Sequence, residues 1–291
     1  MFKSCKNEVI LKSYIFFIFI AVFTSYAARE PVVTHKKHKR YQPLLCRDRP
    51  YRSCLNKFGF IVGDIVQDAL KLNWYLFSVT SAKVITGFIP PYLLTRQFDE
   101  RIQCHFYDEA CHKNVNQFPK ACHTIAKNGV GIPMVLLSSL VVFAPDEDLR
   151  QTARMFIIGL PFVHSGKDII KKMRSKCCLR PWNENFSCTK RSSGGFPSGH
   201  MANVTYAATL FGIRHGLEWA IPLSCLAAFV FADFVNCNRH YVSQLIAGAG
   251  LGVLYALAAD QVIKRKFSEH CSCSVGRDEQ GHSTIKVAYK F

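Results

Sequence analysis

Residues 194–200, with the sequence GGFPSGH, form the stretch that decides how this chain folds. Glycines and a proline favour a turn, and the apolar run from Val204 to Ile213 that follows favours a helix. Backbone N–H groups at a helix start are directed toward one point and attract anions. His200 stands at this helix start, and Arg180 lies upstream with several lysines before it. The stretch therefore predicts a phosphate site that contains a histidine.

The composition indicates an anionic partner. The chain has 291 residues, a formal net charge of +17 and 49% apolar residues. This length fits one domain with an arm, and the apolar fraction is sufficient for a core. A strong positive charge favours binding of phosphorylated molecules, acidic lipids or nucleic acids. Because the sequence contains no nucleic-acid-binding motif, we expect a phosphorylated lipid or a small phosphoester, a membrane, and no nucleic acid.

The chain has 13 cysteines, several of them in sequence clusters. No cluster has the paired Cys-x2-Cys spacing of a zinc site, so we expect no metal site. In an oxidising compartment several of these cysteines are expected to form disulfides, although the sequence does not determine the pairing.

The N-terminal region resembles a targeting segment followed by an arm. Residues 1–27 have early lysines, an apolar run from Tyr14 to Phe23, and small residues at Ser25 and Ala27. This pattern predicts a signal peptide cleaved after Ala27, with an uncleaved anchor helix as the alternative. Residues 28–73 are predicted to form a basic arm that ends in an amphipathic helix. The arm is either a solvated tail or attracted to anionic lipid headgroups.

Residues 74–266 are predicted to form the main helical domain, with a polar tail without strands over 267–291. Lys83 and Pro90 make 74–94 a poor membrane span, and 96–128 reads as a loop or short helices. The fold class is therefore all-α, a bundle of about six helices with several possible transmembrane spans. The apolar segments that predict the core helices are 129–144, 149–172, 200–213, 217–236 and 240–263. The small residues at 248–252 predict close packing of the last helix.

Two histidines are expected to meet at one end of this bundle. His200 and His240 each follow a turn at the start of a predicted helix. Two helices separate them, so the chain returns to the same end before His240. Residues 180–199 lie at that end as well.

Three motifs in this order resemble the type 2 phosphatidic acid phosphatase / vanadium haloperoxidase superfamily, over roughly residues 125–265. Residues 197–200, Pro-Ser-Gly-His, match its second motif. Arg180 and the following proline match the end of the first motif, with Lys172 one residue further upstream than the family spacing. Lys171 is the competing candidate for this lysine, and Lys172 is alternatively a solvated lysine at a helix end. His240 and the residues to Gly248 resemble the third motif.

The third motif departs from the family pattern at three positions. The family has serine and arginine where this chain has Asp233 and Phe234, and a carboxylate where it has Gln244. Arg239 is the nearest guanidinium in the sequence, one residue before His240.

The resemblance implies a mechanism residue by residue. His240 would attack phosphorus and form a phosphohistidine, His200 would protonate the leaving oxygen, and Gln244 would orient His240. The phosphate oxygens would be held by a set of positive and N–H groups, namely Lys172, Arg180, Ser198 and Gly199.

The resemblance thus implies a phosphatase that hydrolyses a phosphomonoester or diphosphate, on a lipid, without a cofactor or metal. One alternative is a weakened or inactive relative that binds phosphorylated lipid, because Phe234 and Gln244 depart from the motif. A second alternative is a vanadate-dependent haloperoxidase. The expected location is the membrane or an extracytoplasmic compartment, with the active site facing outward.

Overall fold

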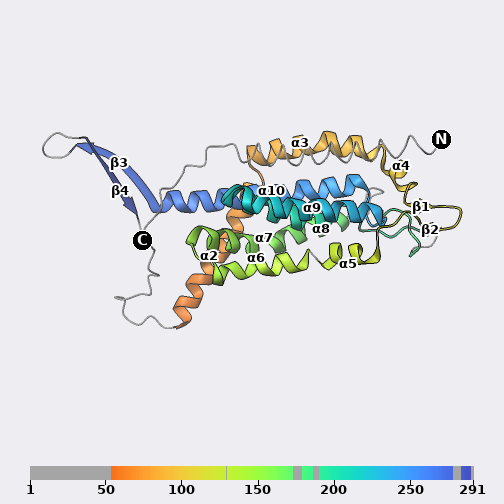
Figure 1. Cartoon of the computed structure of the whole chain (residues 1–291). Helices are drawn as coiled ribbons and strands as arrows, with labels where there is room; N and C mark the ends of the chain where they lie inside the picture. The colour runs from red at the N-terminus through yellow and green to blue at the C-terminus, as the bar shows by residue number, and fades with distance from the viewer. Residues whose placement is uncertain (1–53, 129, 173–178, 186–189, 278–282, 290–291) are drawn as a thin grey trace.

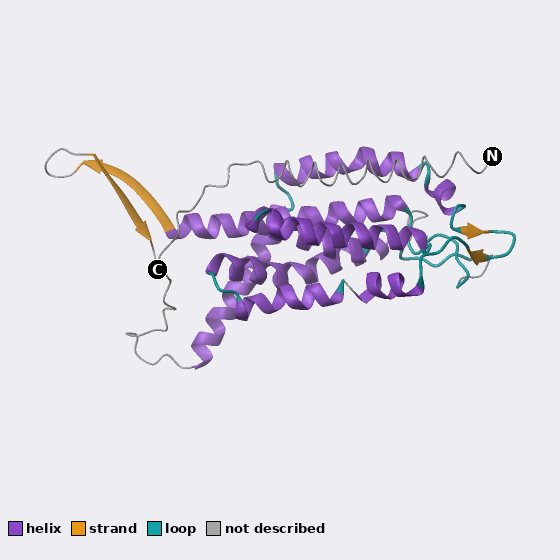
Figure 2. Cartoon of the chain, viewed as in Figure 1, coloured by secondary structure: helices purple, strands orange, loops and turns teal. Residues whose placement is uncertain are grey.

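The computed structural model describes residues 54–128, 130–172, 179–185, 190–277 and 283–289. Over these residues the chain is a bundle of helices, which confirms the predicted all-α class (Figure 1 and Figure 2). The predicted signal peptide and most of the basic arm lie outside the described residues.

The helices follow the apolar segments of the sequence closely. The described helices are α2 (Cys54–Tyr75), α3 (Val79–Arg96), α4 (Asp99–Gln103), α5 (Lys120–Asn128), α6 (Gly131–Phe143), α7 (Glu147–Lys172), α8 (Gly199–His215), α9 (Leu217–Asn236) and α10 (Val242–His270). The region 96–128 contains two short helices and a small antiparallel pair, β1 (Tyr107–Asp108) with β2 (Lys113–Asn114). It is therefore the irregular segment that its polar sequence predicts.

The C-terminal segment corrects one prediction. Residues 267–291 were predicted to be a polar tail without strands, but β3 (Cys271–Arg277) and β4 (Ser283–Tyr289) pair antiparallel. The sequence from Ser283 to Tyr289 includes the β-branched residues Thr284, Ile285 and Val287, which favours a strand. Figure 2 shows this hairpin beyond the end of α10, away from the bundle.

Helix α10 is the central element of the bundle. It packs on α2, α3, α7 and α8. Three glycines on α10 permit these contacts, as the sequence predicted. A Cβ on Gly248 would lie 2.4 Å from the Ser198 carbonyl oxygen, and one on Gly252 would lie 2.4 Å from the Ala202 carbonyl oxygen. The third, Gly250, faces Phe88 of α3. Helices α8 and α10 therefore pack so closely that their backbones are in contact.

Helix α2 belongs to the same packed core. Leu72 and Tyr75 are buried in it, and Arg154 of α7 pairs with Asp68 of α2 at 2.9 Å. The amphipathic pattern predicted a helix here, and the packing shows which face is covered.

Three segments within the described residues are long and apolar enough to cross a membrane. They are Lys120–Phe143, Leu217–Asn236 and Val242–Arg265. The last is mostly buried by other helices, whereas the first two are mostly exposed. Large apolar side chains such as Val135 and Ile221 face outward from them. Such surfaces fit a lipid environment and support a membrane location.

Five cysteines with described side chains bear on the predicted disulfides. Cys225 is exposed, Cys237 is partly exposed, and both are free thiols. Among the cysteines whose side chains the structure describes, Cys104, Cys111 and Cys122 are also free thiols. The predicted disulfides thus have no support from these five residues.

The glycine contacts generate a stability prediction. Gly252→Ala should lower the melting temperature strongly, because its Cβ would overlap the α8 backbone and force the two helices apart, at a cost of about 1–3 kcal/mol. Gly63→Ala on α2 is the matched control, because no atom lies within 4 Å of the added methyl group. It should be neutral or stabilising by about 0.5–1 kcal/mol. Thermal melts of both variants in detergent check this, and equal melting temperatures would contradict the packing argument.

Candidate active site

His200 lies in the first turn of α8, directly after the glycine-rich turn. Ser198 caps the helix, since its side chain accepts a hydrogen bond from the Met201 N–H at 3.5 Å. Ser198 is fully buried, which makes helix capping the role that its geometry supports. A Cβ on Gly199 would lie 2.7 Å from the Lys167 side chain, so the missing side chain lets this lysine approach the helix start.

His240 lies in the turn between α9 and α10, four residues after the end of α9. Asn238 has a φ of 51°, and this left-handed residue reverses the chain. The backbone N–H groups of Arg239 and His240 both donate to the Phe234 carbonyl, at 3.0 and 3.2 Å. The His240 Nδ1 lies 3.4 Å from the Gln244 Oε1, a long hydrogen bond.

Gln244 connects His240 to the loop that carries Arg180. Its Nε2 donates to the Leu179 carbonyl at 2.6 Å, and its backbone carbonyl accepts from the Ser198 N–H at 3.1 Å. A Cβ on Gly195 would lie 2.5 Å from the Gln244 Oε1, so only glycine fits there without displacing the amide. One glutamine therefore joins all three motif segments.

Phe234 contacts both histidines. The His200 and Phe234 rings lie edge to face at 5.0 Å between centroids, and the Phe234 and His240 rings stack at 5.8 Å. Phe234 is fully buried. The structure thus brings His200 and His240 together at one end of the bundle, as the helix count predicted.

Arg239 brings a guanidinium close to Phe234, which stands where the family motif has an arginine. Its guanidinium carbon lies 5.8 Å from the centroid of the Phe234 ring. The motif places an arginine at residue 234, and here the reversed turn brings a guanidinium over that residue from residue 239. Sequence spacing alone did not indicate this direction, because a residue adjacent to a histidine can point to either side of a turn.

The histidines lie among positive charges and are held neutral. Burial, followed by the charges of Arg239, Arg180, Lys167 and Lys171, lowers the pKa of His200 from 6.5 to about 4. Burial, followed by Arg180 and Lys171, lowers the pKa of His240 to about 3, partly offset by hydrogen bonds to Gly195 and Gln244. Burial and then Arg239 also lower the pKa of Arg180. Such a cluster of cations would be stabilised by a bound anion.

Three lysines near the end of α7 are candidates for the lysine of the first motif. Lys172, the predicted phosphate ligand, is exposed at the end of α7, and its role stays a prediction. Lys171 and Lys167 both lower the pKa of His200, and Lys171 also lowers that of His240. Lys167 and Lys171 are four residues apart and share one face of the helix. The sequence analysis missed Lys167.

The polar segment 96–128 holds the turn that carries His240. Buried Asp99 accepts from the Ser243 N–H at 3.1 Å and from the Ser243 hydroxyl at the start of α10. Asn238 donates to the Phe106 carbonyl at 2.9 Å, and the Tyr241 hydroxyl donates to Glu100 at 2.6 Å. The sequence analysis read this segment as a loop and did not detect its role, because these contacts join residues more than 130 positions apart.

Comparison with known proteins agrees with this arrangement. Residues 151–268 match the model of the PAP2 superfamily, which covers α8, α9, the His240 turn and most of α7 and α10. This helical part of the chain is therefore similar to the PAP2 superfamily.

Two individual proteins are similar over part of the chain. A lipid A 1-phosphatase of Porphyromonas gingivalis is 32% identical over 68 residues, which are 22% of this chain and 15% of that relative. This chain therefore spans only a small part of the curated relative's length. The crystal structure of a transmembrane PAP2-type phosphatidylglycerolphosphate phosphatase from Bacillus subtilis superposes with a TM-score of 0.44 at 15% identity. The match covers 69% of this chain and 95% of the Bacillus subtilis chain.

The low pKa of His240 predicts how stability depends on pH. In the unfolded chain this histidine binds a proton near pH 6.5, whereas the folded protein resists protonation until about pH 3. The unfolded state therefore binds more protons as pH falls below about 6.5, so acidification destabilises the fold. Melting in detergent at pH 7 and pH 5 should show a smaller loss for His240→Gln, which has no group to protonate, than for wild type. The same loss in both proteins would rule out a buried neutral His240.

Proposed function

We propose that this protein is a phosphatase that hydrolyses a phosphomonoester or diphosphate, carried by a lipid. The observation that supports this most directly is the pair His200 and His240, both in contact with Phe234 and surrounded by cations. Two neutral imidazoles supply a nucleophile and a proton carrier, and the cations would stabilise the charge on phosphate in the transition state.

In this mechanism His240 attacks phosphorus with the lone pair of Nε2. The bond from phosphorus to the leaving oxygen breaks, and His200 transfers its proton to that oxygen. Water then attacks the phosphohistidine, His200 accepts a proton from the water, and phosphate leaves. His200 has a low pKa of about 4 in the free protein. A bound phosphate would offset the surrounding positive charge, raise this pKa and let His200 carry the proton.

Gln244 is the proposed positioning residue for His240. Its Oε1 can accept the Nδ1–H of His240, so Nε2 stays free for attack. A carboxylate at this position would stabilise the imidazolium further, which glutamine does not. Turnover slower than that of an enzyme with a carboxylate is therefore expected.

Arg180 and Arg239 are the proposed main phosphate ligands, with Lys167, Lys171 and the Gly199 N–H beside them. Arg239 would replace the arginine that the motif places at residue 234. An arginine binds phosphate through two parallel hydrogen bonds wherever its stem starts, so the donor can come from another position in the turn.

A lipid substrate is supported by the apolar exposed helices that lead to this end of the bundle. With 217–236 and 242–265 as membrane spans, the site would lie at the membrane surface, within reach of a headgroup. We propose that it faces outward, which requires that the predicted signal peptide is cleaved, that 74–94 does not span, and that α7 crosses the membrane as well as 120–143.

One alternative rests on a specific observation. Phe234 fills the position of a phosphate-binding arginine, and the orienting group is an amide, so the chain could bind phosphorylated lipid without turnover. Release of inorganic phosphate from a panel of lipid phosphates and diphosphates by purified protein separates the two functions. Turnover abolished in His240→Ala supports the phosphatase. Lipid binding without any phosphate release, lost in Arg180→Ala, would establish the binding protein instead.

Arg239 provides a sharp prediction. Arg239→Ala should reduce kcat/KM about 10²–10³-fold, as expected for loss of one transition-state donor. Arg180→Ala and His200→Ala should each reduce it at least about 100-fold. Lys172→Ala is the matched control and should stay near wild type, because Lys172 is exposed. Steady-state kinetics, with a thermal melt for each variant, measure these effects. A larger loss of kcat/KM in Lys172→Ala than in Arg239→Ala would contradict the proposal that Arg239 is a main phosphate ligand.

The proposal that Arg239 replaces the motif's arginine at residue 234 can also be tested by rescue. Phe234→Arg alone should lower stability, because it buries another positive charge beside Arg239 and His200. Combined with Arg239→Ala, it restores one guanidinium at the family's position, so the double variant should be more active than Arg239→Ala alone. Rates are compared per folded molecule. A double variant that folds but is no more active than the single variant contradicts the proposal.

A further inference from the structure

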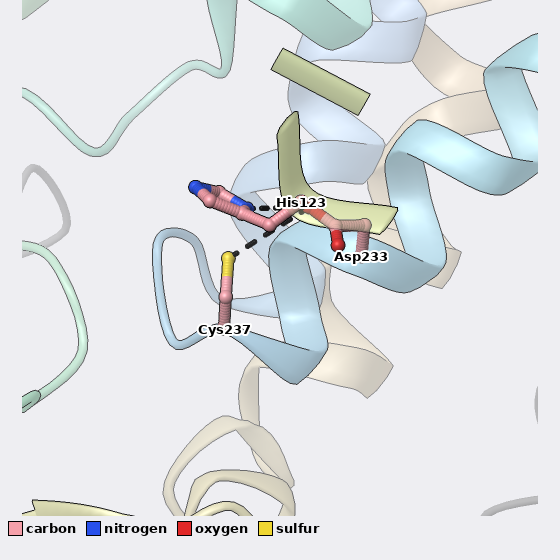
Figure 3. Close-up of side chains that lie close together, drawn as sticks. All are labelled: His123, Asp233 and Cys237. Atoms are coloured by element: carbon pink, nitrogen blue, oxygen red, sulfur yellow. Dashed lines mark hydrogen bonds and ion pairs between the residues drawn. The ribbon is translucent and has the colours of Figure 1, made fainter. Parts of the chain in front are cut away.

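A second cluster of potential ligands lies beside the His240 turn and close to Phe234, whose ring centroid is 6.5 Å from that of His123. His123 of α5, Asp233 of α9 and Cys237 just after α9 have ligand atoms that all lie within 4.8 Å of one another (Figure 3). The His123 Nδ1 lies 2.8 Å from the Asp233 Oδ2, and the Cys237 Sγ lies 4.0 Å from the same oxygen. None of these side chains has a role in the proposed phosphatase mechanism.

The fold explains why these three residues meet. Asp233 and Cys237 are four residues apart, and the Cys237 N–H donates to the Asp233 carbonyl, so both side chains lie on one helical face. His123 is brought to that face by the segment before α5. There the Phe118 N–H donates to the Asn236 side chain at 2.6 Å, and Asn236 donates to the Asn116 carbonyl at 3.0 Å. The site is therefore built by contacts between segments more than 100 residues apart.

The Asp233 carboxylate is incompletely satisfied. Its side chain is 1% exposed, and among the described residues its Oδ1 has no hydrogen-bond partner. A buried carboxylate oxygen without a partner is energetically costly. The side chain of His123 is 31% exposed, which leaves a route from solvent to the cluster. This unpartnered oxygen is an observation independent of the ligand distances.

We propose that His123, Asp233 and Cys237 bind one divalent transition-metal ion of the zinc type. An imidazole nitrogen, a carboxylate oxygen and a thiolate sulfur are ligands that zinc accepts, whereas magnesium and calcium prefer oxygen alone. One carboxylate and one thiolate neutralise the charge of a divalent ion. Metal–ligand bonds of about 2.0–2.3 Å in a tetrahedron separate ligand atoms by about 3.5 Å, so His123 must move slightly away from Asp233.

The bound ion would tie α5 to α9 and to Cys237, which lies three residues before His240. It would therefore restrain the turn that carries Arg239 and His240 without touching the phosphate. No local pattern indicates this site, because its ligands are spread over 115 positions rather than arranged in a short motif.

The proposal is tested by metal binding to the full chain purified in detergent and stripped with a chelator. Cobalt(II) is the probe, because a cobalt–thiolate bond gives a charge-transfer absorption band. Wild type should bind one more equivalent of cobalt than Cys237→Ser, with this band present only in wild type. Cys225→Ser on α9 is the matched control and should behave as wild type, since Cys225 is exposed and outside the cluster.

His123→Ala and Asp233→Asn should weaken cobalt binding about tenfold or more, and saturating zinc should raise the melting temperature of wild type but not of Cys237→Ser. Cys237→Ser changes a single partly exposed atom, so it keeps the test valid if Asp233→Asn does not fold. Equal metal content and spectra for wild type and Cys237→Ser would overturn the site and leave a His123–Asp233 ion pair. The measurement needs no substrate, so its outcome does not depend on the phosphatase proposal.

Discussion

The start of helix α8 lies against the first turns of α10 so closely that no side chain fits between them. The absent Cβ of Gly248 leaves room for the Ser198 carbonyl, and the Ser198 N–H donates to the Gln244 carbonyl at 3.1 Å. This backbone contact sets where α8 begins relative to α10. Because His200 is in the first turn of α8 and His240 precedes α10, the same contact determines how the two histidines face each other.

The chemistry of the site follows from burial next to like charges. Both histidines are removed from water, and the charges that act on them most strongly are positive, so each stays neutral at physiological pH. Positive groups held near each other by the fold repel, and an anion relieves that repulsion. A bound phosphate would supply the negative charge that this site lacks.

The altered third motif shows how a function-bearing group can be supplied from a new position. A family motif specifies the sequence position of an arginine. Binding of a phosphate depends only on the position of its guanidinium in space. Asn238 adopts a left-handed conformation, the chain reverses, and Arg239 lies over the Phe234 ring. A departure that looks like a lost ligand in the sequence is accompanied by a candidate replacement in space. The same turn also carries Cys237 toward His123 and Asp233.

The sequence by itself determined the helices, their order and the end of the bundle where the motifs meet. Apolar runs of helical length and the count of helices between His200 and His240 carry that information locally. Only the tertiary structure decided which cations reach the histidines, since Lys171 and Lys167 rather than Lys172 lie on the inner face of α7. It also decided that segment 96–128 supports the His240 turn and that His123 joins Asp233. These contacts link residues more than 100 positions apart, and their geometry depends on how helices pack, which no local pattern encodes.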